Sequence, residues 1–400
     1  MTDPKELLRR LDSLVVFRDL SRDPAVRELR RALRACDAAD GMDGFLSHIT
    51  AFESILFLER ECDWSRYLFR LVMESENICI RQCGFGPLPP VLNKALDTEL
   101  EFLRDLSQLR LYEINLPESP PDWLIEWDIS PVDIPGEYHR RMERVGVTGY
   151  GIFARYHVFT MQNGGLIPVL HPDPQKLDQL PGYERERGQI IANTEALLSG
   201  QAAGNVLLYG DAGTGKSSTV KAIVNEYYPR GLRLVEVKKN QLYELPGLMD
   251  ELAENPLKFI IFIDDLSFTA NDDNFSALKA ILEGSAGGRA GNAVVYATSN
   301  RRHLIKENFS DRDGDDIHAA DTRQELMSLA ARFGLTVTFS VPDREKYLFI
   351  IRELAKQYDL TIPEPALSVR AEAFAIRAGG RSARVAKQFI ELCKSGVLNH

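Results

Sequence analysis

The chain has 400 residues, a formal net charge of −10, 44% hydrophobic residues and 26% charged residues. This composition is typical of a globular protein, and its acidity is atypical of a dedicated nucleic-acid-binding protein. Because the sequence contains neither an apolar run of membrane-spanning length nor a secretory signal pattern, we predict a cytoplasmic protein without a membrane partner. The length favours two or three domains.

The first 115 residues are predicted to form a helical N-terminal domain. Their apolar residues recur at helical spacing, and Asp23-Pro24 and Pro90 are typical helix starts. Cys79 and Cys83 lie four residues apart without a nearby histidine or second cysteine pair, so we interpret them as thiols rather than zinc ligands. We expect this domain to recruit a protein partner, although its sequence does not identify one.

Residues 116–175 are predicted to connect this domain to the rest of the chain. Prolines interrupt regular structure between Leu116 and Pro135, which indicates either a linker or a strap laid over the following domain. Trp123 and Trp127 favour the strap, because a free linker would leave both indole rings exposed. A β-hairpin is expected next, with its turn at residues 163–165, Asn-Gly-Gly.

From residue 176 onward, short apolar segments alternate with helical patterns. The expected strands are rich in branched and aromatic residues and cover residues 205–209, 232–237, 259–264, 293–299 and 335–339. Helices between consecutive strands indicate a parallel sheet covered on both faces. We therefore predict an α/β core over residues 176–341, followed by a helical region over residues 342–400.

A glycine-rich stretch after the first of these strands, GDAGTGKS, matches the P-loop pattern G-x-x-x-x-G-K-[ST]. Glycines allow a tight turn that directs backbone N–H groups at phosphate oxygens, and the following helix adds the positive end of its dipole. A chance match in a flexible loop is the alternative, which the flanking strand and helix disfavour. The predicted nucleotide-binding residues are Gly210, Asp211, Ala212, Gly213, Thr214, Gly215, Lys216, Ser217 and Ser218.

Polar residues follow the third and fourth strands. Asp264 is placed to support Mg²⁺, and Asp265 to polarise the water that attacks the γ-phosphate. Asn300 ends the fourth strand, where its amide could contact both the γ-phosphate and this water, although a helix-capping role is compatible with the same position. Arg332 and Arg384 could stabilise γ-phosphate charge, although either arginine taken singly fits a surface role better.

Taken in this order, the motifs resemble those of the AAA+ ATPases over about residues 170–400. The segments FIDDLSF, YATSNRRHL, ARFGL and SARVAKQF are similar to the bacterial AAA+ family catalogued as domain of unknown function 815. The resemblance implies a P-loop fold with a C-terminal helical lid. It assigns Lys216 and Ser217 to Walker A, Asp264 and Asp265 to Walker B, and Asn300 to sensor 1.

The resemblance also implies roles beyond the phosphate site. Arg332 would be the arginine finger that acts on the nucleotide of a neighbouring subunit, and Arg384 would be the sensor 2 arginine of the lid. Leu180 and Tyr183 would lie near adenine. The cofactors implied are ATP and Mg²⁺, and the expected assembly is a homo-oligomeric ring such as a hexamer.

Three functions remain open at this stage. The first is an ATPase that couples hydrolysis to remodelling a macromolecule. The second is a slowly hydrolysing switch or scaffold, because most AAA+ proteins have Glu where this chain has the shorter Asp265. The third is a DNA-associated AAA+ protein, which Arg301 and Arg302 permit and the acidic composition disfavours.

A substrate-threading loop is a further question that the sequence raises. Leu242 and Tyr243 occupy the region where AAA+ unfoldases carry an aromatic-hydrophobic pair. We favour the interpretation in which Tyr243 packs at the start of a helix. Thr269 replaces an acidic residue of the family pattern, and residues 311–321 form an acidic insert.

Overall fold

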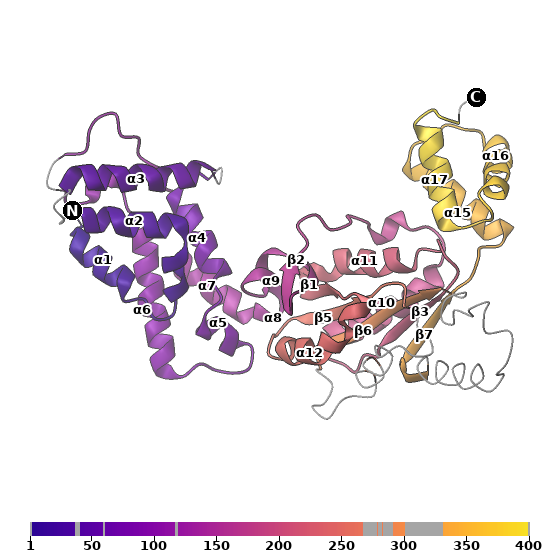
Figure 1. Cartoon of the computed structure of the whole chain (residues 1–400), viewed down its shortest axis with the longest axis horizontal. Helices are drawn as coiled ribbons and strands as arrows, with labels where there is room; N and C mark the ends of the chain where they lie inside the picture. Colours follow the sequence, from indigo (N-terminus) through magenta and orange to yellow (C-terminus); the bar gives the residue numbers. More distant parts are fainter. Residues whose placement is uncertain are drawn as a thin grey trace. The chain divides into compact units, whose positions relative to one another are not determined.

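The computed structural model describes residues 2–36, 41–58, 61–116, 119–266, 291–300 and 331–398, together with Leu278 and Leu282. The chain forms two compact units, an N-terminal unit over Met1–Arg155 and a C-terminal unit over Tyr156–His400. Figure 1 shows the chain coloured from its N-terminus to its C-terminus. Each unit has its own hydrophobic core. Within the described ranges, no helix is both long and apolar enough to cross a membrane.

The N-terminal unit is helical, as predicted. Asp23 accepts a hydrogen bond from the backbone N–H of Val26 (3.0 Å) and so caps the helix that starts at Pro24. Pro90 begins another predicted helix. The helices are α1 (Pro4–Asp12), η1 (Arg18–Arg22), α2 (Pro24–Ala35), α3 (Gly41–Leu58), α4 (Trp64–Glu74), α5 (Ile78–Cys83), α6 (Pro90–Ser107), η2 (Leu111–Glu113), α7 (Ile134–Glu143), α8 (Val145–Thr148) and α9 (Ile152–Arg155).

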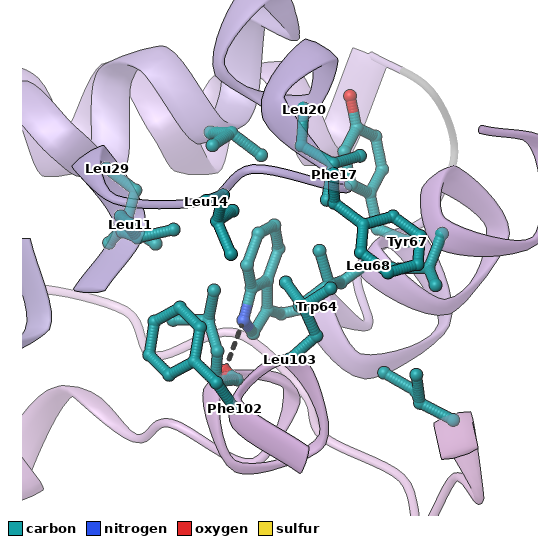
Figure 2. Close-up of a cluster of buried hydrophobic side chains, with 14 of the residues drawn as sticks. Leu11, Leu14, Phe17, Leu20, Leu29, Trp64, Tyr67, Leu68, Phe102 and Leu103 are labelled. Carbon is teal, nitrogen blue, oxygen red and sulfur yellow. Dashed lines mark hydrogen bonds between the residues drawn. The ribbon is translucent and has the colours of Figure 1, made fainter. Parts of the chain in front are cut away.

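Aromatic and leucine side chains fill the core of this unit (Figure 2). Trp64 is fully buried, and its indole N–H donates to the carbonyl oxygen of Leu106 (2.9 Å). Figure 2 shows Leu14, Phe102 and Leu103 around this indole ring. Because the indole nitrogen has an acceptor at the end of α6, the ring can be buried without leaving a polar group unsatisfied.

The proline-rich stretch folds back onto the N-terminal unit, so the prediction of a strap over the following domain is wrong. The ring of Trp127 lies 5.0 Å from that of Phe52, and its indole N–H donates to the carbonyl oxygen of Leu109 (3.0 Å). These partners belong to the unit that precedes the stretch in sequence. Trp123, in contrast, is 68% exposed.

The C-terminal unit is built on one seven-stranded sheet with the order β2-β1-β4-β5-β6-β3-β7. Every neighbouring pair is parallel except β1 with β2. The five predicted strands are all present, which confirms the α/β fold class. The strands are β1 (Val158–Gln162), β2 (Gly165–Pro168), β3 (Val206–Gly210), β4 (Leu232–Glu236), β5 (Lys258–Ile263), β6 (Ala293–Asn300) and β7 (Leu335–Phe339).

The expected hairpin is part of this sheet. Asn163 and Gly164 both have positive φ (52° and 75°), which is the conformation that a two-residue hairpin turn requires. β1 pairs in parallel with β4 and so extends the sheet at that edge. Residues 116–175, expected to form one connector, therefore divide between the two units.

Helices cover the sheet and continue into the C-terminal helical region. Side chains of α10 and α11 pack in one core with every second residue of the strands, which are the residues on one face of the sheet. α12 contacts β6. α15 packs against both α16 and α17, and Figure 1 shows these three helices gathered at the C-terminal end. The elements are η3 (Leu177–Gln179), α10 (Glu184–Leu198), α11 (Lys216–Tyr227), η4 (Tyr228–Arg230), η5 (Lys239–Glu244), α12 (Leu245–Ala253), α15 (Arg344–Gln357), α16 (Glu364–Arg377) and α17 (Ala383–Lys394).

Candidate functional site

The glycine-rich loop joins β3 to α11 and needs its glycines for two different reasons. A Cβ at Gly210 (φ 144°) would lie 2.0 Å from the carbonyl oxygen of Phe339, so a larger residue does not fit beside β7. Gly213 and Gly215 adopt positive φ (76° and 90°), which shapes the turn. Among the described residues, no side chain caps α11 at Gly215, and the first N–H groups of such a helix can bind an anion.

Lys216 lies at the centre of the predicted site. Its side chain is buried, and its ammonium group donates to the carbonyl oxygens of Gly210 (3.0 Å) and Asp211 (2.8 Å) and to Oδ1 of Asn300 (2.9 Å). Burial lowers the pKa of Lys216, and the neighbouring aspartates oppose that shift. A bound phosphate would offer negatively charged oxygens in place of these uncharged acceptors. A buried ammonium group interacts more favourably with a charged acceptor than with an uncharged one.

The carboxylates that follow β5 face the start of α11 and the end of β6. The hydroxyl of Ser217 donates to Oδ1 of Asp264 (2.6 Å). The side-chain N–H of Asn300 donates to Oδ1 of Asp265 (2.8 Å). With Lys216 bound to the same Asn300, the structure brings these five predicted residues into one hydrogen-bonded cluster at the carboxyl ends of three parallel strands.

Ser217 and Asp264 present the ligand type that Mg²⁺ prefers. Both offer oxygen atoms, and Mg²⁺ at nucleotide sites commonly takes one or two protein ligands together with phosphate and water. Among the described residues, no group of three or more His, Cys, Asp and Glu side chains forms a complete metal cage. The donor set therefore fits an ion that is held jointly with a phosphorylated substrate.

Thr298 belongs to this cluster, although the sequence analysis did not assign it a role. Its hydroxyl donates to Oδ1 of Asp264 (2.5 Å) and accepts from the backbone N–H of Asp265 (2.9 Å). A signal for it was present in the sequence. Residues two apart in a strand point to the same face, so a strand that directs Asn300 into the site directs Thr298 there as well.

Leu180 and Tyr183 line a pocket beside the glycine-rich loop. The same pocket is bounded by Thr214 and Gly215 of the loop and by Ala383 of α17. The lining alone does not identify a base, so the role of Leu180 and Tyr183 near adenine stays a prediction.

Tyr183 also contacts the helical region that follows β7. It adopts positive φ (63°), its hydroxyl donates to the carbonyl oxygen of Ser340 (2.7 Å), and the ammonium group of Lys346 lies 3.6 Å from its ring centroid. Burial raises the pKa of Tyr183, so its hydroxyl stays protonated at neutral pH. One wall of the pocket is thereby attached to the start of α15.

The C-terminal helices also touch the glycine-rich loop directly. The backbone N–H of Arg384 donates to the carbonyl oxygen of Gly213 (2.9 Å), and the Arg384 side chain is exposed. Arg381 is instead paired with Glu372, at 2.7 Å between its Nη2 and Oε2. Of these two arginines, Arg384 lies beside the glycine-rich loop, and its contact with a nucleotide stays a prediction.

Arg332 is half-buried just before β7. Its predicted partner is the nucleotide of a neighbouring subunit, which a single chain does not contain. Arg301, Arg302, Thr269 and the acidic insert over residues 311–321 lie outside the described residues.

The structure separates the two residues considered for a threading loop. Leu242 is fully buried in η5, whereas Tyr243 is 69% exposed. The favoured interpretation, in which Tyr243 packs at a helix start, is therefore wrong. Leu242 is the side chain that packs, because consecutive residues of this short helix cannot both face the core.

Comparison with known proteins gives a family match and remote structural similarities. A family model described as protein of unknown function (DUF815) matches residues 153–397. A search of curated proteins found no match. Two point-mutant structures of Thermotoga maritima RuvB share 18% identity with this chain at a TM-score of 0.38, covering 56% and 57% of it and 67% of each RuvB chain. The Thermotoga maritima RuvB Holliday junction branch migration motor shares 17% identity at a TM-score of 0.32, covering 56% of this chain and 72% of that one.

Proposed function

The chain belongs to the family described as protein of unknown function (DUF815), and we propose that it is an Mg²⁺-dependent ATPase of the AAA+ type. We further propose that it works as a homo-oligomeric ring that remodels a macromolecule recruited through the N-terminal unit. One observation carries the ATPase proposal. Lys216, Ser217, Asp264, Asp265 and Asn300 converge in a single hydrogen-bonded cluster beside a glycine-rich loop.

In this proposal the loop and α11 bind the triphosphate. Lys216 exchanges the carbonyl oxygens of Gly210 and Asp211 for oxygens of the β- and γ-phosphates. The uncapped N-terminus of α11 adds backbone N–H groups and the positive end of the helix dipole. Ser217 and Asp264 would hold Mg²⁺, which neutralises charge on the phosphates when bound.

Hydrolysis needs a water molecule aligned with the γ-phosphate and a group that accepts its proton. Asp265 is exposed at the end of β5 and has a carboxylate suited to this role. Asn300 is hydrogen-bonded to both Asp265 and Lys216, so it can fix the position of the carboxylate relative to the ammonium group. Arg384 would contact phosphate within the chain, and Arg332 would do so across a subunit boundary.

A nucleotide-dependent switch with slow hydrolysis is the second candidate. The observation that favours it is the carboxylate of Asp265, which is one methylene shorter than Glu and is already hydrogen-bonded to Asn300. A hydrogen bond to the carboxylate stabilises its charged form, which makes it a weaker base for abstracting a proton from water. The two candidates share ATP binding and differ in turnover.

Steady-state phosphate release from Mg²⁺-ATP, measured over a range of protein concentrations, tests the proposal. We expect turnover per subunit to rise with concentration and to be lost in Lys216→Ala. Lys356→Ala is the matched control, because Lys356 lies on α15 in an exposed pair with Glu353. ATP binding without turnover would favour the switch, and failure to bind ATP would refute both candidates.

A further inference from the structure

Thr298 connects the two carboxylate residues through a single hydroxyl group. Its Oγ1 donates to Oδ1 of Asp264 and accepts from the backbone N–H of Asp265. The side chain is 2% exposed, so water does not offer a ready substitute for either hydrogen bond. Oδ1 of Asp264 thus accepts from both Thr298 and Ser217, and its orientation is determined from two sides.

Asp265 has an unusual backbone conformation at this point. Its φ is 53°, in the left-handed region that residues with a side chain seldom adopt. Such a conformation persists where surrounding contacts hold it in place, and it is frequent at functional sites. The N–H group that donates to Thr298 belongs to Asp265, and its nitrogen is one end of the N–Cα bond about which φ is measured. The hydrogen bond therefore acts directly on the residue with the unusual conformation.

The end of β6 also holds the next residue. The backbone N–H of Leu266 donates to the carbonyl oxygen of Thr298, and the hydroxyl of Ser299 donates to the carbonyl oxygen of Leu266 (2.7 Å each). Residues 264–266 are therefore attached to β6 by backbone and side-chain groups together. Within this set, the hydroxyl of Thr298 contacts both the carboxylate of Asp264 and the backbone N–H of Asp265.

We infer that Thr298 is a positioning residue for hydrolysis, and this inference rests on the proposed ATPase function. Its hydroxyl orients Asp264 and holds Asp265 in the left-handed conformation that directs a short carboxylate toward Asn300. Both hydrogen bonds of the Thr298 hydroxyl go to the two aspartates, so it acts through Asp264 and Asp265.

Thr298→Val and Thr298→Ser separate the hydroxyl from the shape of the side chain. Valine keeps the branched shape and removes both hydrogen bonds, whereas serine keeps the hydroxyl. We expect Thr298→Val to lower kcat by about tenfold or more with KM for ATP within about twofold, because the phosphate-binding loop is unchanged. Thr298→Ser should restore most of the rate, and the Mg²⁺ concentration for half-maximal activity should rise only in the valine variant.

Thr336→Val on β7 is the matched control. It replaces a hydroxyl with a methyl group in the same way, at an exposed residue outside the cluster. A second test uses the Asp265→Asn background, in which Thr298→Val should lower kcat by a smaller factor than in the wild type, because the part of its effect that acts through Asp265 is already lost. Thr298→Ala also removes the hydroxyl and serves if the valine variant does not fold.

The outcomes distinguish this inference from the proposed function. Wild-type turnover that persists in Thr298→Val, or a serine variant as slow as the valine variant, would refute the positioning role and leave the ATPase proposal intact. A parallel rise in KM would also refute it, because it would indicate damage to nucleotide binding. A wild-type protein that neither binds nor hydrolyses ATP would refute the proposed function itself.

Discussion

Gly210→Ala is expected to unfold the C-terminal unit under conditions in which the N-terminal unit stays folded. The added Cβ would lie 2.0 Å from the carbonyl oxygen of Phe339, and no rotation of a methyl group relieves an overlap with backbone. β7 must therefore move away from β3, although these strands are paired in register from Val206↔Leu335 to Gly210↔Phe339.

The size of the effect follows from two contributions. The φ of 144° at Gly210 is unfavourable for alanine by about 1–3 kcal/mol. Separation at the end of the β3–β7 ladder would lose two or three hydrogen bonds, at about 1 kcal/mol each. The sum of roughly 3–6 kcal/mol is a large part of the stability of a typical domain, which is about 5–15 kcal/mol.

The distribution of tryptophan provides the assay. All three tryptophans, Trp64, Trp123 and Trp127, belong to the N-terminal unit, so indole fluorescence reports its unfolding alone. Circular dichroism reports helices and strands of both units. In urea, Gly210→Ala should shift a circular dichroism transition to lower concentration and leave the fluorescence transition unchanged.

Gly200→Ala is the control for backbone conformation without a clash. Gly200 has φ of 71°, and a Cβ there would meet nothing within 4 Å. Its expected cost is about 1 kcal/mol. If Gly210→Ala destabilises the C-terminal unit no more than Gly200→Ala does, the argument from the Phe339 contact is refuted.

Three further predictions concern the N-terminal unit. Burial raises the pKa of Glu53 from 4.5 to about 7. Because the folded state binds this proton more tightly than the unfolded state, the free energy of unfolding should fall by about 1–3 kcal/mol as pH rises from 4.5 through 7. In urea titrations, Glu53→Gln should remove this pH dependence. Trp127→Ala should cost about 3–5 kcal/mol and Trp123→Ala less than about 0.5, so equal losses would contradict the packing described. Glu99→Ala should cost at least about 2 kcal/mol by thermal unfolding, because its buried carboxylate accepts N–H groups of the turn after α1, and a neutral result would exclude that role.

Several features of the site follow from the sequence alone because they depend on local patterns. The spacing of Gly210, Gly215 and Lys216 matches a phosphate-binding loop. The backbone and lysine of such a loop bind phosphate without help from distant parts of the chain. The apolar runs before Asp264 and Asn300 identify buried strands, and parallel strands place their carboxyl ends at one edge of the sheet. The meeting of Lys216, Asp264 and Asn300 could therefore be predicted without coordinates.

Other features depended on contacts between residues far apart in the chain. The large indole ring of Trp127 favours burial but does not indicate which core buries it, and its contacts with Phe52 and Leu109 decide that. The pairing of β1 with β4 likewise joins segments that no local signal relates.

The conformation of Asp265 and the role of Thr298 were decided by tertiary structure for the same reason. The residues next to Asp265 in the sequence do not predict its left-handed φ, and aspartate usually adopts other conformations. It is stabilised by a hydroxyl from β6, which the sheet brings beside β5. The sequence alone indicates the groups that we propose as the site. Their orientation came from the folded structure, because it depends on hydrogen bonds between strands.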